Sequence, residues 1–291
     1  MSETDSDIDE NLTPPDILET ATKMTNNLLP EKSRKIYEKT YEEFMDWRMK
    51  KNTTSYSENV LLVYFQEMSE KLKSPTLWTK FSMLKSTLGI HHNIDMTKYS
   101  KLIAFLKRKS EGYKGKKSKT FSPDQIKKFM SKAPDKIYLF SKTALIFGIM
   151  GACRRQELYN LQFKDVQVFE TTILVNIYNT KTKISRSFSI TGCYYEVCRK
   201  YIELRPNPCS SPYFFLNFQA GKCTTQRIGI NKFGYLGKVI ANYLDLPNPE
   251  LFTGHCFRRT SATLLVDSGG DITTLKRHGG WKSTTSSRGI Y

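Results

Sequence analysis

The sequence predicts a mainly α-helical protein with a small β-hairpin or sheet, an α+β fold built in two parts. Apolar residues recur at helical spacing through most of residues 31–106 and again after residue 122. One stretch, residues 171–190, instead alternates apolar and polar residues around a turn. We therefore expect a tail at 1–30, a helical domain at 31–106, a linker at 107–121 and a second domain at 122–291.

The charge of the chain predicts a polyanionic partner. Its 291 residues contain 45 Lys and Arg against 28 Asp and Glu, a formal net charge of +17. Residues 1–30 begin with an acidic run, and we interpret them as a disordered tail. Nucleic acid is the first candidate partner, and an anionic membrane surface is the second.

Two features argue against a membrane protein. The longest uncharged apolar run, Thr143 to Cys153, is too short to span a bilayer. The acidic start is unlike a signal peptide. We expect neither a membrane partner nor a small-molecule substrate.

The cysteines predict reduced thiols rather than a metal site or a disulfide framework. They are scattered, with no C-x-x-C pair and no paired histidine spacing. This pattern is typical of a nuclear or cytosolic protein. The six positions are Cys153, Cys193, Cys198, Cys209, Cys223 and Cys256.

Residues 31–109 predict four helices. The first spans Glu31 to Lys51, the second follows Ser57 as its cap, the third restarts at Pro75, and the fourth covers Tyr99 to Lys109. The apolar residues of each helix fall on one stripe, which indicates a core and not a cofactor site. The stripe residues are Tyr37, Tyr41, Phe44, Leu61, Phe65, Met68, Leu72, Leu77, Phe81, Leu84, Leu88, Leu102, Ile103 and Leu106.

Residues 107–121 predict a basic linker. The run K-R-K-S-E-G-Y-K-G-K-K-S-K contains two glycines and almost nothing apolar. It is either a solvated connection only or a segment drawn to a phosphate backbone, and a nuclear localisation role fits both. Its candidate DNA-binding residues are Lys107, Arg108, Lys109, Lys114, Lys116, Lys117 and Lys119.

The second domain begins with a helix capped by Ser122 and Pro123. Residues 137–153 are apolar nearly all round and predict its buried central helix. Arg154 and Glu157 then follow three residues apart, so they form either a structural ion pair or part of a site.

A β-hairpin is predicted at Thr171 to Ile190, with Lys181 and Lys183 at its tip. Helices are predicted at Gly192 to Leu204 and Ile230 to Leu244, with a short strand at Tyr213 to Leu216 between them. For residues 219–227 no element is predicted.

The C-terminal stretch carries groups suited to phosphate chemistry. His255 and Arg258 are three residues apart, so both side chains are expected on one face of a helix. Together with Tyr291 they form a set that can grip a phosphate, move a proton and supply an oxygen nucleophile. Alone, His-x-x-Arg is also what a surface pair looks like, so its meaning depends on the residues upstream.

In order along the chain, Arg154-x-x-Glu157, the hairpin Lys181, His255-x-x-Arg258, G-G-Trp281 and a late Tyr291 resemble the tyrosine recombinase/integrase family. The resemblance covers residues 122–291, and the preceding helices fit the family's core-binding, SAM-like domain by architecture. The segments H-C-F-R-R-T-S-A-T and R-H-G-G-W-K-S-T-T are most similar to the eukaryotic Crypton-type branch carried by transposable elements.

The resemblance implies a site-specific DNA recombinase or integrase that works through a 3′-phosphotyrosyl intermediate without metal, ATP or another cofactor. By this resemblance Tyr291 is the nucleophile, and Arg154 and Arg258 bind the reacting phosphate. Lys181, with Lys183 as the alternative, protonates the leaving oxygen. The remaining implied roles are proton transfer or phosphate orientation by His255, an indole N–H from Trp281, support of Arg154 by Glu157, and DNA binding by Lys183 and Arg259.

The same resemblance implies double-stranded DNA as the partner, a dimer or tetramer on that DNA, and a nuclear location. Trp281 and Tyr291 lie ten positions apart, one more than the family pattern, and Ser286 and Ser287 indicate a loop that absorbs the extra residue. Because the family normally continues with a further helix, we also expect a truncated or decayed element. The alternatives are an inactive DNA-binding relative and a type IB topoisomerase, whose branch has lysine where His255 stands.

Overall fold

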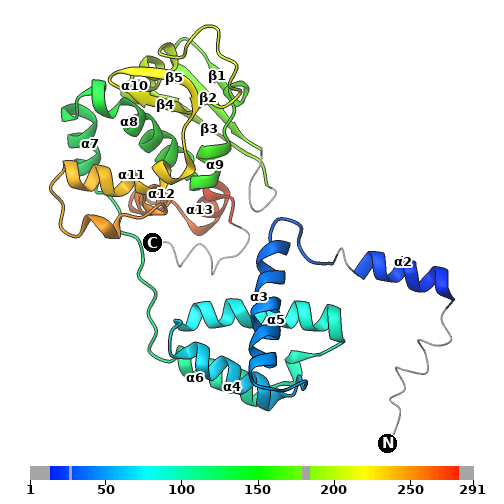
Figure 1. Ribbon diagram of the computed structural model, residues 1–291. Helices are drawn as coiled ribbons and strands as arrows, with labels where there is room; N and C mark the ends of the chain where they lie inside the picture. Colours follow the sequence, from blue (N-terminus) through cyan, green and yellow to red (C-terminus); the bar gives the residue numbers. More distant parts are fainter. Residues whose placement is uncertain (1–13, 26–27, 179–183, 282–291) are drawn as a thin grey trace, which may run out of the picture. The chain divides into compact units, whose positions relative to one another are not determined.

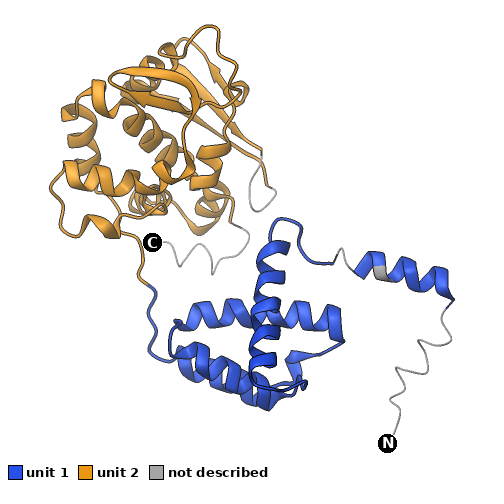
Figure 2. Cartoon of the chain, viewed as in Figure 1, with its two compact units in different colours: residues 1–115 blue, residues 116–291 orange. Residues whose placement is uncertain are grey.

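The computed structural model describes residues 14–25, 28–178 and 184–281. The chain divides into two compact units, Met1–Gly115 and Lys116–Tyr291 (Figure 2). The boundary between them falls inside the segment that the sequence marks as a linker. Both units are mostly helical, and the described strands form two small antiparallel sheets (Figure 1), which confirms the predicted fold class.

Four of the described helices of unit 1 pack into a bundle with one core. The helices are α3 (Arg34–Lys50), α4 (Glu58–Ser69), α5 (Ser74–His92) and α6 (Ser100–Ser110) (Figure 1). They follow the predicted apolar stripes closely, because the stripe residues at helical spacing meet in the interior. Leu61, Phe65, Leu84 and Leu88 are fully buried there.

The sequence does not reveal α2 (Pro15–Thr25) or α13 (Ile272–Gly279) as helices. α2 lies inside the segment expected to be a disordered tail. Proline at its first position and Asp16 in its first turn suit a helix N-terminus, and Lys23 pairs with Glu19 one turn away. Its apolar residues Ile17 and Leu18 are exposed. The acidic, then Ser-, Thr- and Pro-bearing composition of residues 1–30 indicates a disordered tail and does not reveal this helix.

Unit 2 begins with two helices whose starts and burial were predicted. Ser122 accepts a hydrogen bond from the backbone of Gln125, whose side chain binds back to the Ser122 backbone, and this capping box opens α7 (Pro123–Lys132). α8 (Asp135–Met150) is buried along most of its length. It packs against strands of both sheets and against four helices, so it is the central helix of the unit. These helices are α9 (Arg155–Asn160), α10 (Gly192–Glu203), α11 (Ile230–Tyr243) and α12 (Cys256–Asp267).

The first sheet has the order β1-β2-β3, with antiparallel neighbours. β2 (Thr172–Ile177) and β3 (Arg186–Thr191) form the expected hairpin, with Ile177 opposite Arg186 at its described end. β1 (Val166–Val168) is a short third strand that the sequence analysis did not predict. Ile173, Val175 and Ile190 point into the core, in line with their alternation.

The second sheet corrects the prediction for residues 213–227. The strand expected at Tyr213 to Leu216 instead begins at Leu216, as β4 (Leu216–Gln219), and pairs with β5 (Lys222–Arg227). The sheet is flanked by α10 (Gly192–Glu203) and α11 (Ile230–Tyr243), where helices were expected. β5 has few apolar residues and no fully buried one, so its strand conformation comes from pairing with β4 rather than from its own pattern.

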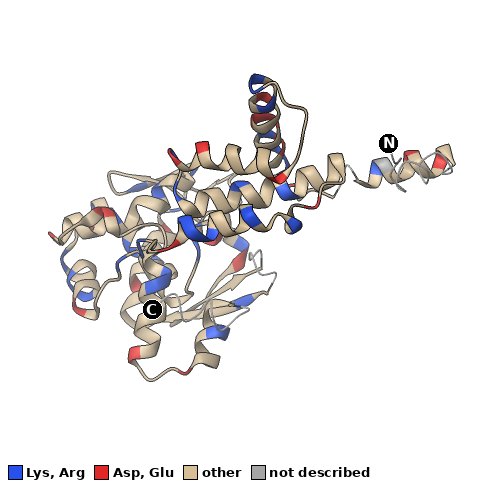
Figure 3. Cartoon of the chain, turned by 90° about the horizontal axis from the view of Figure 1, so that it is seen from below, with Lys and Arg blue, Asp and Glu red and all other residues tan. Residues whose placement is uncertain are grey.

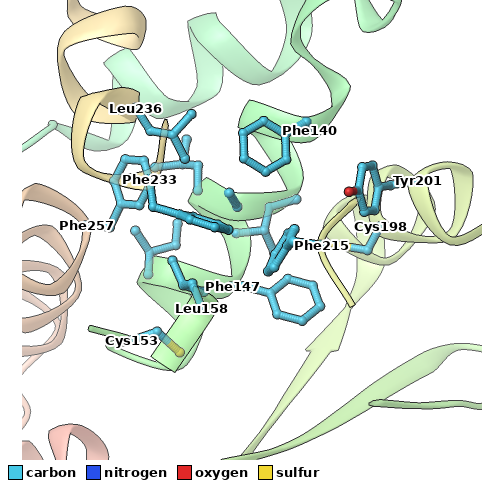
Figure 4. Close-up of a cluster of buried hydrophobic side chains, with 14 of the residues drawn as sticks. Phe140, Phe147, Cys153, Leu158, Cys198, Tyr201, Phe215, Phe233, Leu236 and Phe257 are labelled. Carbon is cyan, nitrogen blue, oxygen red and sulfur yellow. The ribbon is translucent and has the colours of Figure 1, made fainter. Parts of the chain in front are cut away.

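The chain then passes into α12 (Cys256–Asp267) and α13 (Ile272–Gly279). α12 packs against α8, and α13 packs against α12. Aromatic and aliphatic side chains around α8 form the core of the unit (Figure 4). Phe147 lies among Phe214 and Phe215 there, with ring centroids 4.9 and 5.5 Å away.

Within the described residues, no helix is both long and apolar enough to cross a membrane.

Candidate active site

A pocket of about 380 Å³ opens in unit 2 where α9 and α12 begin and α13 ends. Most of the side chains around it are basic or polar. The residues that line it are Lys116, Lys117, Ser118, Arg154, Thr253, His255, Arg258, Arg259 and Trp281. Four predicted catalytic residues, scattered over more than 120 positions of the sequence, therefore meet in one cavity.

Arg154 enters the pocket from the junction between α8 and α9. It is the N-cap residue of α9 (Arg155–Asn160), and its backbone N–H donates to Glu157 Oε2 at 2.8 Å. Its Nη1 donates to Glu157 Oε1 at 2.6 Å. The ion pair anticipated between these residues is present, and Glu157 acts at the same time as cap of the helix and as holder of the guanidinium.

Glu157 has a second guanidinium partner, Arg186 at the start of β3. Arg186 Nη2 donates to Glu157 Oε2 at 2.6 Å, and its Nε and Nη2 donate to the Gly151 carbonyl at 3.2 and 3.1 Å. The Arg186 side chain is 7% exposed and that of Glu157 is 2% exposed. Burial alone would raise the pKa of Glu157, but the hydrogen bonds and charge of Arg186 and Arg154 outweigh it and lower the pKa.

Arg258 projects from the first turn of α12 and is held by backbone carbonyls. It donates to the carbonyl of Ala152 and, through Nη2, to that of Gly279 at 2.6 Å. Burial and the nearby charge of Arg154 lower the pKa of Arg258 to about 9. Its positive charge is thus costly to bury, and an anion in the pocket would relieve that cost.

Trp281 lines the pocket in contact with Arg258. The guanidinium carbon of Arg258 lies 4.2 Å from the centroid of the Trp281 ring, a cation–π contact. The tryptophan is buried and packs with Ala262 and Leu275. A Cβ on residue 279 would lie 2.0 Å from the Trp281 ring, so Gly279 is a steric requirement.

His255 also lines the pocket. It is the N-cap residue of α12 rather than a residue inside the helix, so it and Arg258 reach the pocket from the same first turn. Partial burial lowers the pKa of His255, and the guanidiniums of Arg258 and Arg155 lower it further. The imidazole is therefore neutral at pH 7 in the free protein and able to accept a proton.

Three predicted residues lie outside the described part of the chain: Lys181 and Lys183 at the hairpin tip, and Tyr291. The described ends of β2 and β3, Ile177 and Arg186, lead to that tip. The place of Lys181, Lys183 and Tyr291 relative to the pocket therefore stays a prediction.

The described basic residues that were expected to bind DNA lie at four places in the fold. Lys107, Arg108 and Lys109 belong to the last turn of α6, because that helix continues into the predicted linker, and Lys114 is exposed in unit 1. Lys119 donates to the Pro247 carbonyl at 2.9 Å, which fixes it to the loop before His255. Lys116, Lys117 and Arg259 line the pocket, and the Nε of Arg259 is buried without a hydrogen-bond partner among the described residues.

The sequence analysis missed Arg186 as a site residue. It stands at an alternating position of a strand, and its partner is 29 residues away, so no local pattern distinguishes it from a surface arginine. Its burial and its pairing with Glu157 arise only from the fold.

In the described part of the chain no three His, Cys, Asp or Glu side chains group as a metal site.

Lys and Arg recur along the helices of both units (Figure 3), as expected from the net charge of +17.

Comparison with known proteins agrees with this arrangement. Residues 119–291 match the phage integrase family, and the chain belongs to this family of tyrosine recombinases. A probable integrase/recombinase protein of Methanocaldococcus jannaschii is 27% identical over 150 residues. The match covers 49% of this chain and 43% of that protein, so the chain spans less than half the length of this relative.

Solved structures share the fold at low sequence identity. The Tn1549 transposon integrase in complex with transposon right end DNA is 19% identical, with a TM-score of 0.65 over 93% of this chain and 92% of that one. The XerH site-specific recombinase bound to difH substrate is 17% identical, with a TM-score of 0.64 over 96% and 82%. A lambda integrase dimer bound to a core site is 12% identical, with a TM-score of 0.61 over 94% and 93%.

Proposed function

We propose that this chain is a site-specific DNA recombinase that cuts and rejoins a DNA strand through a 3′-phosphotyrosyl intermediate. The observation that carries the proposal is the meeting of Arg154, His255, Arg258 and Trp281 around one basic pocket. Two guanidinium groups aimed at one cavity suit a phosphodiester, whose non-bridging oxygens gain negative charge in the transition state.

In the proposed reaction the Tyr291 hydroxyl attacks phosphorus while the bond to the 5′ oxygen breaks. His255, neutral at pH 7, accepts or steers the proton of the attacking hydroxyl. Lys181, or Lys183 in its place, gives a proton to the leaving 5′ oxygen. Arg154 and Arg258 supply the positive charge that a metal ion supplies in other phosphoryl transfers. The phosphotyrosyl bond keeps the energy of the phosphodiester, so rejoining is the reverse of cutting and needs no ATP.

Double-stranded DNA is the proposed partner. The net charge of +17 favours a phosphate backbone, and the XerH, Tn1549 and lambda structures are complexes with DNA. We also propose assembly as a dimer or tetramer on DNA, nuclear location and descent from a Crypton-type transposable element. A pull-down of differently tagged copies on one duplex, and imaging of a fluorescent fusion, test the first two.

A covalent-trapping assay tests the chemistry. A pool of random duplexes, each nicked near a candidate cleavage position, releases a short fragment after attack and so leaves the protein attached to DNA. We expect a protein–DNA adduct that survives denaturing electrophoresis with the natural chain and is absent with Tyr291→Phe. Arg154→Ala and Arg258→Ala should each lower the rate of adduct formation by about 10²–10³-fold while DNA affinity falls only modestly.

The controls separate the alternatives. If DNA is bound but no adduct forms with any sequence, the chain is a DNA-binding relative without cutting activity. If either arginine substitution abolishes binding itself, the assignment of these arginines to chemistry is wrong. Relaxation of supercoiled DNA without any preferred site would indicate a type IB topoisomerase.

A further inference from the structure

The start of unit 2 is fixed against the loop that leads into the pocket. Ser118 Oγ donates to the Leu251 carbonyl at 3.2 Å and accepts from the Thr253 backbone N–H at 3.0 Å. The Lys119 backbone N–H also donates to the Leu251 carbonyl, at 2.9 Å. This anchoring places the two preceding residues, Lys116 and Lys117, in the wall of the pocket.

The pocket holds more positive charge than one phosphate requires. Five of the residues that line it are Lys or Arg, and none of its described lining residues is Asp or Glu. Arg154 is already paired with Glu157. With Arg154 and Arg258 assigned to the reacting phosphate, three cations remain: Lys116, Lys117 and Arg259. A DNA strand carries its phosphates in series, so the nearest source of further negative charge is the adjoining phosphate of the same strand.

We propose that Lys116, Lys117 and Arg259 form a second phosphate subsite, which binds the phosphate next to the reacting one. This inference rests on the proposed function, because it takes Arg154 and Arg258 as the site of the reacting phosphate. The subsite fixes the strand on one side of the scissile bond. Lys116 and Lys117 are thus positioning residues for one phosphate rather than part of a diffuse basic linker. Lys114, only two residues earlier, does not line the pocket.

Thymidine 3′,5′-bisphosphate tests the subsite, because its two phosphates are separated by one sugar, as in a DNA strand. Thymidine 5′-monophosphate and thymidine 3′-monophosphate are the one-phosphate controls. Binding is followed by quenching of Trp281 fluorescence in a Trp47→Phe/Trp78→Phe background, since Trp281 lines the pocket and the other two tryptophans belong to unit 1.

We expect the bisphosphate to bind about tenfold more tightly than the better monophosphate, as an added charge-assisted contact predicts. Lys116→Ala/Lys117→Ala should remove this preference and leave monophosphate affinity within about twofold. Lys114→Ala should keep the preference. All three lysines are exposed, so the folded state is retained, and circular dichroism checks it.

Two results would overturn the subsite: no preference for the bisphosphate in the natural chain, or an equal preference in Lys116→Ala/Lys117→Ala. Failure of the proposed function gives a different pattern. If Arg258 does not bind the reacting phosphate, Arg258→Ala leaves the affinity for both kinds of nucleotide unchanged, whatever the lysines do.

Discussion

Replacing Arg186 with methionine should destabilise unit 2 more than most substitutions of a polar residue. Methionine keeps much of the length of the side chain and removes its donors. The change deletes the hydrogen bonds from Arg186 to Glu157 and to the Gly151 carbonyl. It leaves a carboxylate that is 2% exposed with one guanidinium, that of Arg154, instead of two.

The size of the effect follows from that burial. Removing one partner of a buried ion pair costs roughly 3–5 kcal/mol, because the other charge is left uncompensated. Glu157 keeps Arg154 Nη1 at 2.6 Å and the Arg154 backbone N–H at 2.8 Å, so part of this cost is avoided. We expect a loss of about 2–4 kcal/mol in the free energy of unfolding. With a urea m-value of roughly 2 kcal/mol/M, the midpoint should fall by about 1–2 M.

Urea unfolding of the full chain, followed by circular dichroism and tryptophan fluorescence, measures this loss. Arg199→Met is the matched control. Arg199 is also paired with two carboxylates, Glu196 and Glu203, but its side chain is 45% exposed, so its midpoint should not change measurably. The double variant Arg186→Met/Glu157→Gln should recover part of the loss, because no buried charge is then stranded. Equal midpoints for Arg186→Met and Arg199→Met, or purely additive losses in the double variant, would refute the reasoning.

Four further predictions follow from the same structure. The cutting rate should rise with pH through a midpoint below 6.5, the usual pKa of histidine, and stay flat above it. The reason is that burial and neighbouring guanidiniums lower the pKa of His255. The pH profile of His255→Gln should lack this step. Because the pKa of Glu157 is lowered in the folded chain, its charge stabilises the fold above about pH 4.5. That gain disappears as pH falls through the folded value, so urea midpoints of the natural chain and Glu157→Gln should converge in acid. Gly148→Ala should lower the thermal midpoint by an overpacking cost of about 1–3 kcal/mol, since the new Cβ would lie 2.6 Å from the Phe257 ring; an unchanged midpoint would mean that α12 moves freely. Ser122→Ala should cost about 1 kcal/mol of stability through loss of the capping box, and Ser122→Asp should restore it.

Most of the helices could be predicted because their signals are local. The stripes of unit 1 and the capping box at Ser122 depend on residues within one or two turns of each other. The hairpin of β2 and β3 was visible for the same reason, through alternation on both sides of a turn. β5 was not, because its residues become a strand only by pairing with β4.

For the site too, local sequence patterns identify some residues and not those that depend on distant parts of the chain. Residue types and their order pointed to Arg154, His255, Arg258 and Trp281, and these four line one pocket. Neither the role of Arg186 nor the place of Lys116 and Lys117 was visible. Arg186 depends on a carboxylate from another element, and the lysines depend on Ser118 anchoring the chain to residues 251–253. Such relations belong to the packed structure and leave no periodic trace in the sequence.

Arg186 and Arg258 each donate to a backbone carbonyl at a helix end, a group that carries no full charge. Gly151 caps the end of α8, and Gly279 is the last residue of α13, so their carbonyls belong to helix ends that lack intrahelical partners. Arg186 uses the first of these carbonyls and Arg258 the second. The negative ends of helix dipoles favour cations there without cancelling their charge.

The two guanidiniums assigned to the reacting phosphate, those of Arg154 and Arg258, differ in the groups that hold them. Arg154 is tied to the carboxylate of Glu157, which fixes its position and offsets part of its charge, because Glu157 also pairs with Arg186. Arg258 is tied to the Ala152 and Gly279 carbonyls and to the face of Trp281, which fix its position and leave its charge uncompensated. A phosphate entering the pocket therefore gains most from Arg258, and Arg154 serves mainly to orient it. On this argument Arg258→Lys, which keeps the charge and loses the fork of donors, should slow cutting less than Arg258→Ala, whereas Arg154→Lys and Arg154→Ala should be nearly equivalent.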